Sequence, residues 1–259
     1  MPNYLLYAPE GSDTGKALVD ELKTLGIDIN GGSNPPTSRV DILIRYGSRV
    51  PIPKGLARKV INPASSLASA ANKLQTLTTL KESGLHLQQP NVWSPNSPDL
   101  VFPVLGRRIE HSKGTDVQFV NSRFDLKWAA THDPKSEYFV ELLPVETEWR
   151  IHVVAGQRIR TSIKYLADES LRNVNPLVRN VASGWKFRHP ESHEKPPALL
   201  SMAAKYAVDM LGLDFGAVDC ARLDTGRGCI FEVNTAAGLV TSQQGPQLYA
   251  KAFKREYFS

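Results

Sequence analysis

Hydrophobic and polar residues follow two periods along the chain, and each period predicts one kind of element. Within residues 1–62, a short apolar run predicts a buried strand, and apolar residues three and four apart predict a helix. The predicted elements are a strand at 4–8, a helix over 14–26, a loop rich in Gly, Asn and Pro over 30–36, and a strand over 39–46. A strand, a helix and a strand in this order are typical of a βαβ unit with a parallel sheet. We expect its regular structure to end near Pro53.

The remaining residues, 63–259, predict helices between short strands and hairpins. Ser65 and Ser66 are candidate N-caps of one long helix that runs to about Ser83. A stretch rich in Pro, Asn and Ser over 89–98 predicts a linker. Further predicted elements are short strands at 101–105, 117–120 and 138–143, a hairpin over 149–165, a polar loop over 167–197, a hairpin over 216–234 and a last helix over 246–257.

Another helix is predicted over 198–211, because apolar residues recur there at helical spacing. The residues expected to face the core from this helix are Leu199, Met202, Ala203, Tyr206 and Met210. The chain contains no internal repeat and no low-complexity tract.

The composition is typical of a globular protein outside the membrane. Of the 259 residues, 41% are hydrophobic and 22% are charged, and no apolar run approaches the roughly 18 residues that a membrane helix needs. The N-terminus does not resemble a signal peptide and two cysteines cannot form a disulfide scaffold, so we expect a cytoplasmic protein. The 31 Lys and Arg are interspersed with 26 Asp and Glu, which indicates neither a nucleic-acid partner nor a membrane partner. The oligomeric state stays open.

The hairpin over 216–234 is the most informative part of the chain. Its centre, Thr225-Gly226-Arg227-Gly228, has the residues of a turn. A symmetric turn puts Asp219 opposite Glu232 and Ala217 opposite Asn234, so that these polar side chains share one face. The opposite, core face is expected to hold Val218, Cys220, Phe231 and Val233, with Cys220 opposite Phe231 and with Cys229 on the same face as a second buried thiol.

Two carboxylates at facing positions, with Cβ atoms about 5 Å apart, repel each other unless something compensates. One carboxyl group can have a raised pKa, neighbouring Arg or Lys can pair with the acids on a surface hairpin, or a cation can bind. Two carboxylates and an amide suit a hard cation such as Mg²⁺, which completes its shell with water and phosphate oxygens. The geometry therefore favours a nucleotide site with Asp219, Glu232 and Asn234 as metal ligands, while the surface hairpin stays open as an alternative.

F-G-A-V-D, followed by a hairpin and F-E-V-N-T-A-A-G-L, resembles the C-terminal signature of ATP-grasp ligases. The resemblance is closest to the carboxylate–amine ligase branch that includes the ribosomal-protein glutamate ligases, and it extends over about 40–245. It implies an α/β fold: a short βαβ unit over 1–62, then the two α+β lobes of an ATP-grasp domain over 63–259. The small nucleotide-clamping lobe would cover about 99–145 and the metal-bearing lobe about 146–259. The family's metal ligands fall on the same Asp219, Glu232 and Asn234.

The resemblance also implies a set of nucleotide-binding residues. Lys73 would contact the phosphates, and Arg107 or Arg108 stands where the family has a second phosphate-binding lysine, which is a departure from its pattern. H-S-K-G-T-D over 111–116 resembles the loop that folds over the phosphates, although it has one glycine where relatives often have several. Y-F-V-E-L-L-P-V-E-T-E-W-R over 138–150 resembles the hinge between the two ATP-grasp subdomains, and its backbone and Glu141 would meet the adenine. The full set of implied nucleotide-binding residues is Lys73, Arg107, Glu141, Leu142, Leu143, Glu148 and Arg179.

The implied activity is ATP-dependent ligation of a carboxylate to an amine through an acylphosphate, with Mg²⁺, which Mn²⁺ can replace. Arg150, Lys164 and Asn180 are the implied catalytic residues. The partners would be ATP, a carboxylate donor and an amine acceptor, such as an amino acid, a peptide or a polypeptide terminus. An ATP-grasp kinase and an inactive nucleotide-binding protein are the alternatives, and the sequence does not identify the substrates.

Two other candidate motifs lack the spacing that their function needs. G-S-D-T-G-K after the first strand has three residues, not four, between its glycines, and Ala17 follows its lysine, so it is not a Walker A motif. His189 and His193 are four residues apart in a Pro-flanked loop, which is not a zinc-binding arrangement.

Overall fold

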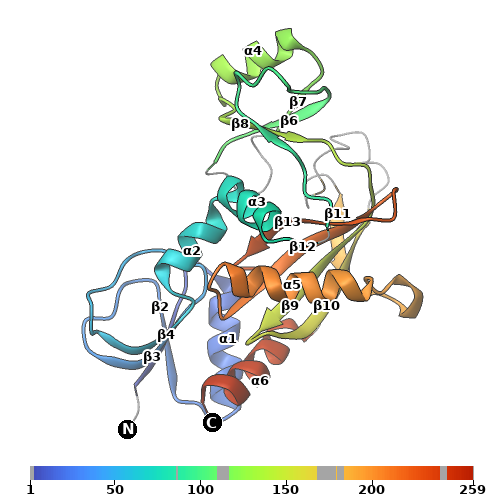
Figure 1. Ribbon diagram of the computed structural model, residues 1–259. Helices are drawn as coiled ribbons and strands as arrows, with labels where there is room; N and C mark the ends of the chain where they lie inside the picture. Colours follow the sequence, from blue (N-terminus) through green and yellow to red (C-terminus); the bar gives the residue numbers. More distant parts are fainter. Residues whose placement is uncertain are drawn as a thin grey trace.

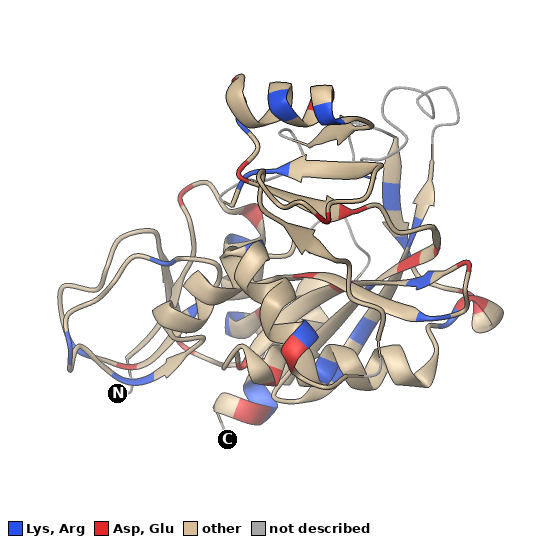
Figure 2. Ribbon diagram, turned by 45° about the horizontal axis from the view of Figure 1, so that its top comes forward, with Lys and Arg blue, Asp and Glu red and all other residues tan. Residues whose placement is uncertain are grey.

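The computed structural model describes residues 3–85, 87–109, 117–167, 179, 184–239 and 244–258. These residues form three sheets that follow one another along the chain. In Figure 1 the first sheet lies near the chain termini, the second sheet lies at the opposite end, and the third and largest sheet lies between them. Within the described ranges, no helix is long and apolar enough to cross a membrane. Lys and Arg are spread over the elements together with Asp and Glu (Figure 2).

The first sheet is parallel, with the strand order β2-β1-β3-β4. Its elements are β1 (Tyr4–Tyr7), α1 (Asp13–Thr24), β2 (Ile29–Gly32), β3 (Val40–Arg45) and β4 (Ala57–Ile61). The predicted strand, helix and strand are confirmed as β1, α1 and β3. The loop predicted over 30–36 is wrong at its start, because β2 pairs with β1 from Ile29 onward, and β4 extends the sheet beyond Pro53. In β2 only Ile29 is buried, so it carries no apolar period.

The long helix predicted up to Ser83 is two helices, α2 (Ala64–Ala71) and α3 (Lys73–Glu82). They break at Asn72, whose backbone is extended (φ −80°, ψ 94°) and whose side chain accepts a hydrogen bond from the N–H of Gln75 at 3.0 Å. Asn72 thus caps α3 and places Lys73 at the first position of that helix. The serines predicted as caps lie inside α2, which instead follows Pro63.

The second sheet is antiparallel, with the order β5-β8-β6-β7. Its elements are β5 (Val92–Trp93), β6 (Val104–Arg107), β7 (Gln118–Val120), α4 (Arg123–Thr131) and β8 (Tyr138–Glu141). Leu126 and Ala129 of α4 pack with Val104, Val120 and Phe139 to form a small separate core. The stretch predicted as a linker over 89–98 contains β5, and α4 was not predicted.

The third sheet is antiparallel, with the order β11-β10-β9-β12-β13. Its strands are β9 (Val145–Val154), β10 (Gln157–Leu166), β11 (Trp185–Arg188), β12 (Phe215–Leu223) and β13 (Gly228–Asn234). Both predicted hairpins are confirmed, as β9–β10 and β12–β13. The loop predicted over 167–197 is wrong at β11 and at the short 3₁₀ helix η3 (Ser192–Glu194).

One face of the third sheet is apolar and is covered by α5 (Ala198–Met210), while α6 (Gly245–Tyr257) packs beside α1. The residues that α5 buries are Leu200, Ala203, Ala204, Ala207 and Val208. The predicted inward face is therefore wrong at Leu199, Met202 and Tyr206, which are 46%, 66% and 43% exposed, whereas Ala203 is buried and Met210 is half-buried. The helix carries two apolar stripes, and the one with three alanines lets the helix approach the sheet closely.

Candidate functional site

The β12–β13 hairpin has the predicted register at its open end. Asp219 lies opposite Glu232 and Ala217 lies opposite Asn234. Nearer the turn the register shifts, and Cys220 lies opposite Ile230 instead of Phe231. The turn is one residue shorter than predicted, with the N–H of Leu223 donating to Arg227 at 2.9 Å. The bulge adds one unpaired residue to β13, which compensates for the shorter turn. Asp219 and Glu232 therefore lie opposite each other as predicted.

The bulge also separates the two cysteines. Cys220 belongs to the core beneath α5, whereas Cys229 packs with Leu143 and Leu223 in a different cluster, beside Phe231. The predicted core face is therefore wrong for Phe231 and Cys229. Both thiols are free and buried, as predicted, and burial raises the pKa of each thiol well above its ordinary value.

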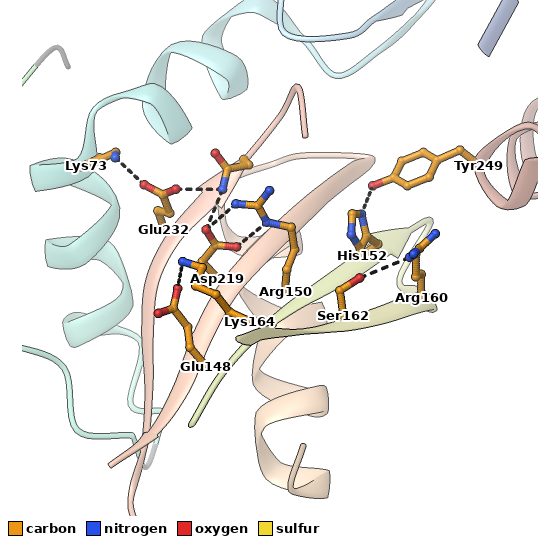
Figure 3. A network of polar contacts seen from close by, with 11 residues as sticks. Lys73, Glu148, Arg150, His152, Arg160, Ser162, Lys164, Asp219, Glu232 and Tyr249 are labelled. Carbon is orange, nitrogen blue, oxygen red and sulfur yellow. Dashed lines mark hydrogen bonds and ion pairs between the residues drawn. The ribbon is translucent and has the colours of Figure 1, made fainter. Parts of the chain in front are cut away.

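The other face of the third sheet is polar, and a row of charged groups crosses it (Figure 3). Arg150 on β9 lies opposite Asp219 on β12 and donates to it twice, Nε to Oδ1 at 2.6 Å and Nη2 to Oδ2 at 2.7 Å. The Nδ2 of Asn234 donates to Asp219 at 3.2 Å and to Glu232 at 2.9 Å. Lys73, at the start of α3, forms an ion pair with Glu232. We call these five residues the charged row.

Cations compensate the repulsion between the facing carboxylates. Burial alone would raise the pKa of Glu232, but Lys73, Asn234 and Arg150 outweigh it and hold that pKa below its ordinary value. Burial would lower the pKa of Arg150, but Asp219 outweighs it and raises that pKa. The raised pKa that the sequence left open is therefore not found at Glu232, whose pKa is lowered instead.

The row has a donor set that fits a hard divalent cation. The amide of Asn234 lies within hydrogen-bond distance of the carboxylates of Asp219 and Glu232, which face each other on neighbouring strands. Oxygen ligands of this kind are those that Mg²⁺ prefers. In the part of the chain that the structure describes, no group of three or more His, Cys, Asp and Glu side chains could hold a metal ion, so a cation bound here would take Asn234 as its third ligand.

A second buried ion pair lies next to the row. Glu148, two residues before Arg150 on the same face of β9, pairs with Lys164 of β10. Arg179 approaches Glu148 to 3.9 Å and donates to the carbonyl of Val145 at 3.0 Å. Burial and the charge of Asp219 raise the pKa of Glu148 against the opposing effect of Lys164. Asn180, the remaining implied catalytic residue, lies outside the described residues.

The residues expected at the nucleotide base and phosphates lie on the second sheet and the hinge. Arg107 ends β6 opposite Tyr138. Tyr138 packs with Leu77, which lies one turn after Lys73 on α3, so this end of the second sheet lies near the charged row. Burial raises the pKa of Tyr138. Glu141 accepts hydrogen bonds from the backbone and side chain of Asn91 at 3.0 and 2.9 Å.

The remaining residues expected near the nucleotide are Leu142, Leu143 and Arg108, for which the structure gives burial. Leu142 is half-buried, and Leu143 is buried against Leu223 and Cys229. Arg108, the alternative to Arg107, is exposed. The loop expected to cover the phosphates, 111–116, lies outside the described residues.

Sequence reasoning missed polar residues at the far end of the same face. His152 of β9 hydrogen-bonds to the hydroxyl of Tyr249 of α6 at 2.9 Å, and the Nε of Arg160 donates to Ser162 at 3.3 Å. Side chains on a strand alternate between its two faces, so His152 lies on the same face of β9 as Glu148 and Arg150. This alternation could have predicted the position of His152 from the sequence.

No family model matches the sequence, and no curated protein matches it. Solved structures do match over nearly the whole chain. The macrocyclase MdnC bound with precursor peptide MdnA, from Microcystis aeruginosa MRC, is 13% identical with a TM-score of 0.64, over 97% of this chain and 98% of that one. The ATP-grasp ligase PsnB complexed with minimal precursor is 13% identical with a TM-score of 0.69, over 98% and 99%. D-alanine–D-alanine ligase from Bacillus anthracis is 14% identical with a TM-score of 0.65, over 97% and 92%. These similarities confirm the predicted ATP-grasp fold.

Proposed function

We propose that this protein is an ATP-dependent carboxylate–amine ligase. The observation that carries the proposal is the charged row, which joins Lys73, Glu232, Asn234, Asp219 and Arg150 on one face of the third sheet. The row occurs in an ATP-grasp fold, and the named structures of that fold include ligases. In the proposed reaction, a substrate carboxylate attacks the γ-phosphorus of ATP and ADP leaves. The amine then attacks the carbonyl carbon of the acylphosphate, loses a proton, and releases phosphate as the amide forms.

Asp219, Glu232 and Asn234 would hold Mg²⁺, or Mn²⁺ in its place. When bound, the ion would neutralise negative charge on the phosphates during the transfer. The protein's own cations complete this neutralisation: Lys73 and Arg150 are fixed beside the carboxylates, where negative charge develops on the transferred group. Catalysis would then consist of positioning and charge stabilisation, without a covalent protein nucleophile.

The nucleotide would lie between the second and third sheets. The backbone of 141–143 would face the adenine, and Glu148 the ribose, with Arg107 and Arg179 on the phosphates. Lys164 holds Glu148 in place, and Asn180 would act on the transferred group. The end of the first sheet at Ile61 supports a division at residue 62 between the βαβ unit and the ATP-grasp domain. The proposed lobes cover about 99–145 and 146–259, although β5 of the second sheet precedes the first of them.

The test is product analysis by mass spectrometry. The protein is incubated with Mg-ATP, hydroxylamine, and a pool of amino acids and short peptides, which includes candidates for the glutamate-ligase branch. The proposal expects ADP together with new hydroxamates, and neither product with the variant Asp219→Asn. A stable phosphorylated acid without hydroxamate would instead establish a kinase. ATP that binds and is never turned over would establish a binding protein.

A further inference from the structure

The polar face of the third sheet continues past the charged row. β9 begins four residues after β8 ends, so the direction from Glu148 through Arg150 to His152 leads away from the second sheet. On the neighbouring strand, Ser162 lies opposite Arg150 and Arg160 lies opposite His152. Figure 3 shows this order: the charged row on one side, and His152, Ser162, Arg160 and Tyr249 on the other. A phosphate-accepting substrate would therefore lie beyond Arg150, next to these residues.

Of the four residues that Figure 3 shows at this end of the face, Arg160 is the one with a charged side chain. His152 and Tyr249 are buried and bonded to each other, and burial, with the charges of Arg150 and Arg160, lowers the pKa of His152 to about 3. His152 is thus neutral at physiological pH. Arg160 is half-buried, and burial lowers the pKa of its guanidinium only from a very high ordinary value, so it stays positive. Its Nε bond to Ser162 restricts its orientation.

The first sheet contacts the segment that follows β13. Tyr46, directly after β3, donates its hydroxyl hydrogen to the carbonyl of Ala237 in the segment that follows β13. Gly47 has φ +79° and lies so close to Ala236 that a Cβ there would be 2.5 Å from it, so a larger residue would push the segment away. Tyr46 also stacks on Phe215, and Phe215 packs edge-on against Tyr249, so the first sheet reaches the residues around His152.

We propose that Arg160 binds a carboxylate that does not react, while the reacting carboxylate lies at Arg150. This inference rests on the proposed ligase function. Two residues along a strand cover about 6.6 Å and neighbouring strands are about 4.8 Å apart, so the two arginines suit carboxylates a few bonds apart. A guanidinium pairs with a carboxylate through two parallel hydrogen bonds. The second carboxylate belongs either to the donor acid, which is then a dicarboxylate, or to an amine acceptor that is an amino acid.

Calorimetric binding distinguishes these sources without requiring turnover. The protein is saturated with Mg²⁺ and the non-hydrolysable analogue AMPPNP, then titrated with glutarate or its monoamide glutaramate, and with L-alanine or L-alaninamide. Each pair differs only in the second carboxylate. The variants are Arg160→Gln, Arg160→Lys and the matched control Arg158→Gln. Arg158 lies on the same strand but donates to Ser201 of α5 at 3.0 Å, on the opposite side of the sheet.

In at least one pair, we expect the carboxylate to bind about tenfold or more tightly than the amide, the effect of a hydrogen bond to a charged group. Arg160→Gln should abolish that preference, Arg160→Lys should keep part of it, and Arg158→Gln should keep all of it. No preference in either pair, or a preference that survives Arg160→Gln, would overturn the inference. If hydroxamates form but the carboxylate binds no more tightly than the amide, the ligase function holds and the carboxylate site at Arg160 is rejected. If the carboxylate binds more tightly but no hydroxamate forms, the site at Arg160 holds and the ligase function is rejected.

Discussion

Arg150 and Asp219 face each other on β9 and β12 and share two hydrogen bonds of 2.6 and 2.7 Å, with side chains that are 18% and 7% exposed. The same two-point contact recurs between Arg222 and Glu146, at 2.8 and 2.6 Å, but there both side chains are more than 40% exposed. The pairs have the same chemistry and differ in burial. They therefore form a natural comparison of what burial adds.

Arg150→Gln should lower the free energy of unfolding by about 3 kcal/mol, because it leaves the carboxylate of Asp219 buried without its main partner. Arg222→Gln should cost less than about 1 kcal/mol, because water replaces an exposed partner. Urea unfolding of both variants, without nucleotide, measures the difference. Equal costs would mean that the buried pair contributes no more than a surface pair.

Asn72→Ala should destabilise the protein by about 1 kcal/mol, since the N–H of Gln75 loses its cap. Asn72→Asp restores an acceptor and should recover that loss. Because the cap also fixes Lys73 at the start of α3, Asn72→Ala should weaken Mg-AMPPNP binding in calorimetry severalfold. Unchanged nucleotide affinity alongside the loss of stability would show that Lys73 does not depend on the helix break.

Stability should fall in mild acid because of His152. Its folded pKa is lowered to about 3, below the ordinary value of 6.5. Below pH 6.5 the unfolded chain takes up a proton that the folded protein does not, so stability is complete above pH 6.5 and falls toward pH 3. Between pH 7 and 5, urea unfolding should show that wild type loses about 2 kcal/mol more than His152→Gln. Parallel pH profiles would contradict a buried neutral histidine.

Cys220 and Cys229 should resist thiol reagents in the native protein. Both are buried, and burial raises the pKa of both thiols, so little thiolate is available. Labelling with a colorimetric disulfide reagent should be slow in buffer and complete for both thiols in guanidinium chloride. Rapid native labelling of either thiol would place it at the surface.

The sequence predicted elements best where one face of the chain is clearly apolar. The strand period of β9, β10, β12 and β13 was legible because α5 covers one face of this sheet and the other face is polar. β2 and β4 were missed because they are short and mostly uncovered. The inward face of α5 could not be chosen from the pattern, because its two apolar stripes differ only in how closely each lets the helix approach the sheet.

The candidate site was predictable as far as it depends on strand register. Counting residues from the turn brought Asp219, Glu232 and Asn234 together, and this held because the shorter turn and the bulge offset each other. In the structure Asn234 donates a hydrogen bond to each of the two carboxylates. The partner of Glu232 could not be derived in this way. Lys73 reaches Glu232 only because a helix breaks at Asn72, where local capping overrides a continuous apolar stripe. Tyr249 likewise reaches His152 through packing across 97 residues of chain.

The most direct test of the proposed active site measures ADP release from Mg-ATP by wild type, Glu232→Gln and Asp224→Asn. Each protein is given hydroxylamine and the pool of amino acids and short peptides described above. Asp224 lies in the turn of the same hairpin and is exposed, so its variant controls for changes in the hairpin itself. Glu232→Gln is expected to stay folded and to lose ADP release, while Asp224→Asn is expected to keep it. Full ADP release by Glu232→Gln would contradict the assignment of the charged row as the catalytic centre.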